Sequence, residues 1–378
     1  MLYLPSEFPL DPEICYLNHA AVSPWPRRTA EAVQRFAFEN LTRGAQGYLE
    51  WMKVEHRLRE RLAWLINAPS PDDIALVKNT SEGLSFVASG IEWNPGDRIV
   101  GIADDFPSNR VVWESLGDRG VAFDSVDINA AADPEQALID RIQSETRLMA
   151  VSSVHFATGL RLDLARLSRA CRDQGVLLCV DAIQSLGAMR FDLNEVPADF
   201  VSADGHKWML APEGLGLLYV NPAIRDSLKL HEFGWAMRER PGDYGTGSWM
   251  PAPNARRFEC GSPNMLGIHA LDASLSLLQE MGFEAIEKLL RANIEKLREQ
   301  LAKIPGIRFV TPADPAHSAG ILSFQVDGRD STALYRQLMA RDVICANRGG
   351  HVRFSPHFHT REETLTAAVA HLRDILSE

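Results

Sequence analysis

The chain lacks several features that would place it in other protein classes. Its 378 residues carry a net charge of -11 with basic residues scattered along the chain, which disfavours a nucleic-acid or anionic membrane surface. No apolar run is long enough to span a bilayer, and the N-terminus has neither the basic start nor the apolar stretch of a signal peptide. These absences favour small-molecule chemistry.

Cysteine usage excludes two further classes. The five cysteines are odd in number, widely separated and without C-x-x-C spacing, which argues against a disulfide framework and against a zinc site. We therefore expect no metal ion and a cytoplasmic location. Repeats, low-complexity tracts and flexible linkers are also missing, so any domains are expected to pack closely.

What the sequence does contain is an alternation of short apolar runs and amphipathic stretches between residues 97 and 220. Near-continuous apolar strands that alternate with helices predict an α/β protein with a largely parallel sheet covered on both faces. The predicted strands are DRIVGIA, VAFDSVDI, RLMAVSSVHF, GVLLCVDAI, ADFVSAD and GLGLLYV. ARLSRACRDQG has helical spacing and ends at Gly175, a typical helix stop.

Beyond residue 262 the pattern changes to long helices and a few short strands, which predicts a smaller α+β domain. The helical segments are IHALDASLSLLQEMG, FEAIEKLLRANIEKLREQLAKI, STALYRQLMARD and a last helix from Arg361, and the strand-like runs are GIRFV, GILSFQV, VICAN and HVRFS. We expect an N-terminal segment (1–15) packed on the small domain, a large domain (16–260) and the small domain (261–378).

Three polar features stand where ligands bind in open α/β sheets, at or near strand ends. Asp181 ends a very apolar run, and Lys207 follows another run before a Gly/Pro-rich loop. Thr80 and Ser81 open a helical pattern, where hydroxyls and free N–H groups suit a phosphate. Each has an ordinary alternative: a structural aspartate, a solvated lysine, and a helix cap formed by Thr80 or Ser81.

Together these features supply the contacts that pyridoxal 5′-phosphate needs: an amine for an imine, a carboxylate for the ring nitrogen and a helix start for the phosphate. Here the chain resembles the class V aminotransferase family of fold type I pyridoxal-phosphate enzymes, which includes cysteine desulfurases and isopenicillin N epimerase-like proteins. The motifs that carry the resemblance are YLNHAAVSP, TSEGL, DDFPSNRVVW, SSVHFATGLRLDL, VDAIQSLGA, GHKWMLAPEGLGLLYV, FECGSPN and HVRFSPHFHT.

The resemblance implies a large domain with a mostly parallel seven-stranded sheet, a smaller C-terminal α+β domain, and a homodimer with active sites at the interface. It also assigns roles to individual residues. Lys207 forms the internal aldimine with the cofactor and Asp181 pairs with the ring nitrogen. The other cofactor contacts that it implies are Phe106 over the ring, Gln184 at the ring hydroxyl, Thr80, Ser81 and His206 at the phosphate, and Ser262 reaching in from a second subunit.

Departures from the family pattern around the cofactor include Phe106, Asp204 and Phe156. Phe106 stands where relatives often carry a histidine, and a phenyl ring can stack but cannot transfer a proton. Asp204 occupies the place of a phosphate-binding serine, so we expect it to turn away from the phosphate. Phe156 replaces an asparagine, with His155 beside it, and the sequence leaves open whether His155 faces the cofactor or is structural.

Arg353 and Cys345 indicate which substrates and reactions to expect. Arg353 matches the family's arginine for the substrate α-carboxylate, and His19 is a second candidate substrate contact. Cys345 lies in an apolar strand-like run, where cysteines are usually inert, which argues against a persulfide-forming desulfurase. We expect an enzyme acting on an α-amino acid, first an aminotransferase, with a C–S lyase, a desulfurase-like enzyme or an epimerase as alternatives and a non-catalytic cofactor-binding protein as a remote one.

Overall fold

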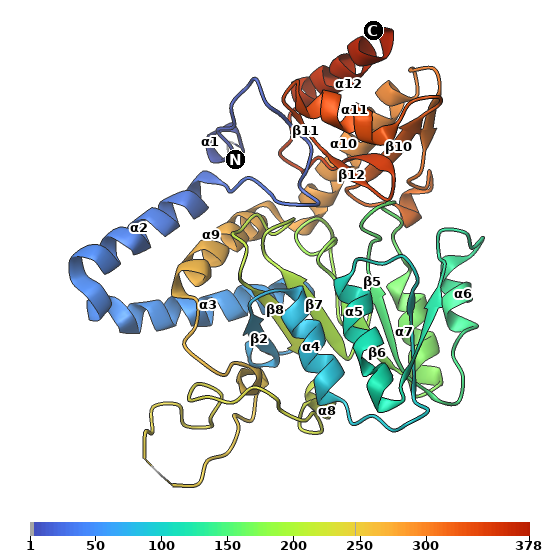
Figure 1. The fold of residues 1–378 in the computed structure, drawn as a ribbon. Coiled ribbons are helices and arrows are strands. Elements are labelled where there is room, and N and C mark those ends of the chain that lie inside the picture. Colours follow the sequence, from blue (N-terminus) through green and yellow to red (C-terminus); the bar gives the residue numbers. More distant parts are fainter. Residues whose placement is uncertain (1–3, 246) are drawn as a thin grey trace.

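A seven-stranded mixed sheet forms the centre of the larger part of the chain in the computed structural model, which describes residues 4–245 and 247–378 (Figure 1). Its strand order is β2-β8-β7-β6-β5-β3-β4, and β8 runs antiparallel to both of its neighbours while the other pairs are parallel. The strands are β2 (Ile74–Val77), β3 (Arg98–Ile102), β4 (Ala122–Val126), β5 (Thr146–Ser152), β6 (Leu177–Asp181), β7 (Phe200–Asp204) and β8 (Gly216–Val220). The predicted α/β class and mostly parallel sheet are confirmed.

Helices cover both faces of this sheet because successive strand residues point to opposite sides. In β6, Leu178 and Val180 join one apolar core and Cys179 joins another. The first core receives side chains from α3, α7 and α9, and the second from α4 and α5. The helices of this part are α2 (Arg27–Arg43), α3 (Tyr48–Ile66), α4 (Thr80–Gly90), α5 (Ser108–Glu114), α6 (Pro134–Ile139), α7 (Leu164–Asp173), α8 (Pro222–Arg225) and α9 (Met265–Met281).

The C-terminal part has its own apolar core around a four-stranded antiparallel sheet of order β12-β13-β10-β9. Its elements are α10 (Phe283–Leu301), β9 (Ile307–Phe309), β10 (Leu322–Val326), α11 (Ser331–Met339), β11 (Val343–Ile344), β12 (Ala346–Arg348), β13 (His351–Phe354) and α12 (Glu362–Ser377). The chain start reaches this part: after α1 (Leu4–Glu7), β1 (Cys15–Tyr16) pairs in parallel with β11. The exact domain limits stay a prediction, and α9 packs on α2 and α3.

The elements differ from the sequence-based prediction in three places. Each of the six apolar runs between residues 97 and 220 contains one strand, but the pattern did not reveal β2. The VICAN run divides between two sheets, because β11 pairs with β1 and β12 with β13, and Cys345 lies at the division. The cap of α4 is Asn79, whose Oδ1 accepts from the N–H of Glu82 at 2.9 Å, so neither Thr80 nor Ser81 caps the helix. Among the described residues, no helix has both the length and the apolar character needed to cross a membrane.

Candidate active site

A cavity of about 330 Å³ lies beyond the carboxyl ends of β6 and β7 and brings together most of the predicted site residues. β6 ends at Asp181 and β7 at Asp204, so the sheet delivers both carboxylates to one edge. The predicted residues that line the cavity are Thr80, Ser81, Phe106, Asp181, Gln184, His206, Lys207 and Arg353. Segments almost three hundred residues apart in the chain thus meet in one place.

Lys207 lies three residues beyond β7 with only 8% of its surface exposed. The chain turns tightly there, since a Cβ on Gly205 would come within 3.0 Å of the carbonyl oxygen of Leu215. Burial lowers the pKa of Lys207 to about 8, against the opposing effect of the Asp181 carboxylate. The Nζ atom lies 5.6 Å from the centroid of the Phe106 ring. A buried amine with a lowered pKa has the properties of a Schiff-base nucleophile and of a general base.

Asp181 is held in place by two hydrogen bonds. Its Oδ1 accepts from the N–H of Ile183 at 2.9 Å, and its Oδ2 accepts from Nδ2 of Asn109 at 2.7 Å. Burial raises the pKa of this carboxyl, while these hydrogen bonds and the nearby Lys207 ammonium favour the ionised form. A buried carboxylate in this setting suits a further positive partner.

The start of α4 presents hydroxyl groups to the same cavity. Oγ1 of Thr80 is buried and has no hydrogen-bond partner within the described part of the chain, and Oγ of Ser81 lies 2.7 Å from Oγ of Ser108. Asp204 also lines the cavity, and its turning away from a bound phosphate stays a prediction. Its Oδ2 lies 3.1 Å from Nδ1 of His206, while its buried Oδ1 has no hydrogen-bond partner in the described part of the chain.

Arg353, on β13, is almost fully buried at 1% exposure. One Nη donates to the carbonyl oxygen of Phe156 at 2.6 Å, whereas Nε and the other Nη have no hydrogen-bond partner among residues 4–245 and 247–378. Burial and the neighbouring Arg348 lower the pKa of this guanidinium. Buried N–H donors without a partner are costly, so this geometry suits a carboxylate that enters the cavity.

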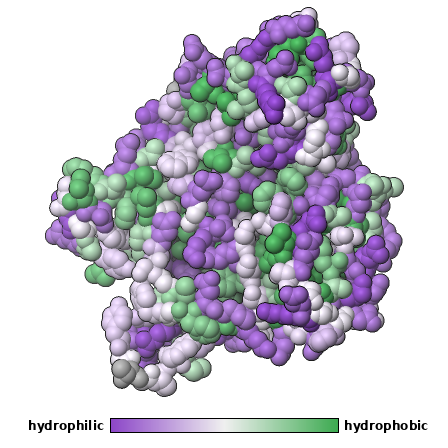
Figure 2. Space-filling view, viewed as in Figure 1, coloured by the Kyte–Doolittle hydropathy of each residue, from purple (hydrophilic) through white to green (hydrophobic). Residues whose placement is uncertain are grey.

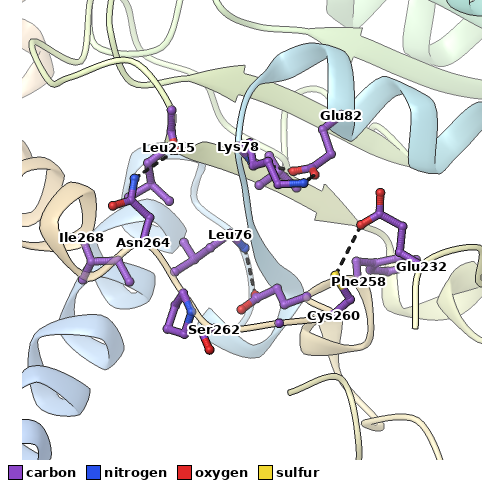
Figure 3. A pocket seen from close by; sticks show the side chains of 15 residues that line it. Leu76, Lys78, Glu82, Leu215, Glu232, Phe258, Cys260, Ser262, Asn264 and Ile268 are labelled. Atoms are coloured by element: carbon purple, nitrogen blue, oxygen red, sulfur yellow. Dashed lines mark hydrogen bonds and ion pairs between the residues drawn. The ribbon is translucent and has the colours of Figure 1, made fainter. Parts of the chain in front are cut away.

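Two predicted residues lie elsewhere. Ser262 lines a separate pocket of about 400 Å³ between β2 and the loop that leads into α9 (Figure 3). His19 is fully buried, its Nδ1 lies 2.9 Å from the carbonyl oxygen of Ser355, and burial lowers its pKa to about 4. The next residues, Ala20 to Val22, line the cavity instead. The structure therefore does not bring Ser262 or His19 together with the other predicted residues.

Two aromatic side chains, Phe106 and Phe156, line one side of the cavity. The rings of Phe106 and Phe156 meet edge to face with centroids 5.5 Å apart, and neither carries an acid or a base. His155 points elsewhere: its Nδ1 lies 3.0 Å from Oγ1 of Thr158 and its Nε2 lies 3.1 Å from the carbonyl oxygen of Asp104. The structural alternative for His155 is thus the one that the geometry supports.

Sequence reasoning missed the residues behind Asp181. Asn109 on α5 and Ser152 at the end of β5 connect Asp181 to a second buried carboxylate, Asp105. Ser152 and Asp105 end or follow apolar runs, which is the signal that singled out Asp181. The amide of Asn109 carries no such signal, because a helical asparagine is ordinary in sequence.

Comparison with known proteins identifies the class and then the family. The chain matches solved structures of one α/β enzyme fold: the cystine C–S lyase C-DES in complex with its product cysteine persulfide (TM-score 0.89, 24% identity, 96% of this chain and 97% of that one) and the apo cysteine desulfurase of Thermococcus onnurineus NA1 (TM-score 0.88, 23% identity, 99% and 97%). The profile of class-V aminotransferases matches residues 15–370. The chain belongs to the class-V aminotransferase family.

Curated proteins with sequences similar to this chain have several different activities. A probable cysteine desulfurase of Methanothermobacter thermautotrophicus is 32% identical over 91% of this chain and 86% of the relative. An isopenicillin N epimerase of Streptomyces clavuligerus is 30% identical over 94% and 93%. The chain is accordingly an enzyme of the pyridoxal 5′-phosphate class, and the relatives alone do not select its reaction.

The cavity fits this cofactor on its own chemistry. The unpartnered hydroxyl of Thr80 at the start of α4 suits a phosphate, the buried Asp181 carboxylate suits a pyridinium nitrogen, and the amine of Lys207 suits an aldehyde. Phe106 offers a ring face beside Lys207. Gln184 also lines the cavity, although its Oε1 already accepts from Nε1 of Trp208 at 2.8 Å and its Nε2 donates to the carbonyl oxygen of Ala20 at 3.1 Å.

Proposed function

We propose that this protein acts on an α-amino acid with pyridoxal 5′-phosphate and that its reaction is transamination. The observation that carries the proposal is the placement of Arg353 and Lys207 in one cavity. A buried guanidinium with unpartnered N–H groups offers a bidentate site for a carboxylate. An amine whose pKa lies near 8 offers a base for the α-proton of the same molecule.

The remaining cavity residues would hold the cofactor. Thr80, Ser81 and His206 are proposed to bind the phosphate, and Asp181 the ring nitrogen. When bound, the cofactor supplies an electron sink that makes the substrate's α-proton acidic. Lys207 would take that proton at its Nζ and hold it for delivery to a different carbon, so one base would serve both transfers. Arg353 orients the substrate by its carboxylate, which places the α-hydrogen toward Lys207.

Transamination is favoured over epimerisation by the side chains around Lys207. Inversion by two bases requires a second proton-transfer group on the other side of the substrate's α-carbon. Phe106 and Phe156 form the aromatic side of the cavity and cannot exchange protons. A suprafacial transfer by Lys207 alone needs no such group.

The position of Cys345 disfavours a persulfide-forming desulfurase. The thiol is 2% exposed in the small-domain core, and burial raises its pKa to about 12. A thiol that accepts sulfur must ionise and reach the substrate, and burial at this position opposes both. Cleavage of a carbon–sulfur bond with direct release of the sulfur needs no cysteine. This lyase reaction is the second candidate, since the relatives include probable cysteine desulfurases.

A panel of L- and D-amino acids, including sulfur-containing ones, tests the reaction. The holoenzyme is incubated with and without a 2-oxo acid acceptor, and keto acid, sulfide and optical inversion are measured. Transamination predicts keto acid formation that depends on the acceptor; sulfide or pyruvate without an acceptor would select the lyase instead. Lys207→Ala should abolish turnover and the visible absorbance of the cofactor, whereas Lys53→Ala, on the exposed side of α3, should leave both unchanged.

We also propose a homodimer in the cytoplasm. Figure 2 shows hydrophobic residues at the tip of the α2–α3 hairpin, where Phe38, Leu41 and Leu49 are between 66% and 81% exposed. Exposed apolar clusters of this kind often mark protein–protein contacts. Ser262 lies outside its own chain's cavity, as a contribution to a second subunit requires. All five cysteines lie in the described part of the chain and are free thiols, which supports a reducing compartment.

A further inference from the structure

A second buried carboxylate lies behind the first. Asp105 follows β3 with 4% of its surface exposed, and it directly precedes the cavity-lining residue Phe106. Its Oδ1 accepts from the N–H of Phe106 at 2.7 Å, and Oγ of Ser152 lies 2.7 and 2.8 Å from its two oxygens. Burying a carboxylate is unfavourable, so its position calls for a reason.

Asp105 and Asp181 are joined by a chain of hydrogen bonds. Nδ2 of Asn109 lies 3.0 Å from Oγ of Ser152 and 2.7 Å from Oδ2 of Asp181. Ser152 is paired with Asp181 across β5 and β6, and Asn109 is the second residue of α5, four residues beyond Asp105. Two different elements, β5 and α5, therefore contribute one side chain each between the two carboxylates.

The two carboxylates, which can only accept, determine which group donates in each hydrogen bond between them. An ionised carboxylate can only accept, so Ser152 must give its single proton to Asp105. Ser152 Oγ is then an acceptor toward Asn109, which must turn its NH2 group, and not its carbonyl oxygen, to both Ser152 and Asp181. The result is that Asp181 receives an N–H at Oδ2. If the hydroxyl proton of Ser152 were free to turn, the Asn109 amide could reverse and set its oxygen against the Asp181 carboxylate.

The charge of Asp105 acts in the same direction. Burial raises the pKa of Asp105 to about 6; the nearby Asp181 carboxylate adds to the rise, and the hydrogen bond from Ser152 favours the ionised form. Two buried carboxylates near each other repel, and each raises the proton affinity of a group bound between or beside them. The negative charge of Asp105 therefore favours a protonated ring nitrogen next to Asp181.

We propose that Asp105 is a positioning residue for the cofactor: through Ser152 it fixes the direction of the hydrogen bonds that hold Asp181 toward the ring nitrogen. This inference rests on the proposed role of Asp181 and extends it to a residue that does not line the cavity. Asp105 thereby acts on the electron sink without touching it.

The test measures the cofactor itself. The holoenzyme and its variants are reconstituted with pyridoxal phosphate labelled with 15N in the ring, and the 15N shift is followed from neutral into alkaline buffer. Asp105→Asn is expected to let the ring nitrogen lose its proton roughly one pH unit earlier. It should also weaken cofactor binding roughly tenfold, the low end of the effect of removing a group that orients a directly contacting residue.

Two further variants separate direction from charge. Ser152→Ala keeps both carboxylates and removes the link, so it should shift the 15N titration in the same direction; a wild-type titration in this variant overturns the proposal. Asp104→Asn removes a neighbouring charge whose side chain is 54% exposed and outside the chain of bonds, and it should leave the titration unchanged. Equal shifts of the 15N titration in Asp104→Asn and Asp105→Asn would show that any nearby negative charge has this effect, and would refute the inference.

Folding and the role of Asp181 are controlled separately. Thermal unfolding of the cofactor-free variants shows whether Asp105→Asn folds. If it does not fold, the 15N titration of Ser152→Ala tests the proposal instead. Asp181→Asn should release the ring proton outright. If the ring nitrogen stays protonated in Asp181→Asn, the proposed role of Asp181 fails, and this result differs from a failure at Asp105 alone.

Discussion

Replacing Arg353 by methionine is expected to remove the enzyme's preference for carboxylates without unfolding it. In the ligand-free chain this guanidinium donates to one carbonyl oxygen, and two of its nitrogens have no partner among the described residues. Removing one partner of a buried, hydrogen-bonded charge pair costs about 2–5 kcal/mol. Taking about 3 kcal/mol, the loss in kcat/KM for an amino acid is roughly 150-fold, since every 1.4 kcal/mol is a factor of ten.

The assay compares each amino acid with the amine that lacks its carboxylate. In the wild type the amino acid should be preferred, and Arg353→Met should lower that preference by roughly 150-fold while the slow reaction of the amine stays the same. Arg348→Met is the matched control, because Arg348 lines the same cavity but is exposed. It should change the preference far less.

Stability gives an independent readout for the same variant. Burying an unpaired charge is costly, so a methionine of similar size should leave the unfolding free energy of the cofactor-free protein unchanged or raise it by up to about 4 kcal/mol. A parallel loss of activity toward the amino acid and the amine, or a lowered stability, would show that Arg353 is structural and would refute the carboxylate assignment.

Three further predictions follow from the same geometry. Cofactor-free protein should gain stability as pH rises from about 8 to about 10.5, by up to about 3 kcal/mol, because the unfolded chain then binds more protons at Lys207 than the folded one; urea titrations of wild type and Lys207→Met check this, and an equal rise in both contradicts it. Cys345→Ser should leave turnover intact, and a loss of sulfide release in that variant would restore the desulfurase alternative. Mixed Lys207→Ala and Ser262→Asp subunits should recover roughly a quarter of native sites if Ser262 serves a second subunit, and no recovery would contradict the shared site.

The sequence predicts those parts of the fold that depend on local patterns. Apolar runs such as LLCVD form buried strands whatever their partners are, so β6 and its neighbours follow from composition and spacing. β2 was missed because its four residues are shorter than a typical strand, and its place at the sheet edge depends on pairing with β8, far along the chain. The division of VICAN between β11 and β12 likewise depends on β1, which no local pattern connects to it.

The same distinction applies to the site. Lys207, Asp181 and Arg353 follow from motif and strand-end position, because each is marked by the apolar run beside it. Side-chain orientation follows from packing instead. Asp204 lines the cavity with its Oδ2 3.1 Å from Nδ1 of His206, and His155 turns to Thr158 and Asp104 because its ring is 1% exposed and must satisfy both nitrogens. The spacing of residues in the sequence predicts neither of these side-chain orientations.

The polar atoms without hydrogen-bond partners mark this cavity as a ligand site more clearly than its volume does. Pockets of about 350 and 400 Å³ lie elsewhere in the chain, so a volume of about 330 Å³ is not distinctive. Around this cavity, Oγ1 of Thr80, Oδ1 of Asp204 and two nitrogens of Arg353 are buried without a hydrogen-bond partner in the described chain. Each such atom costs free energy on folding, and a ligand with a phosphate at one end and a carboxylate at the other would satisfy the two donor groups, the Thr80 hydroxyl and the Arg353 nitrogens. The folded chain is therefore less stable alone than with its ligands, and binding cofactor and substrate should raise its unfolding temperature in two separable steps.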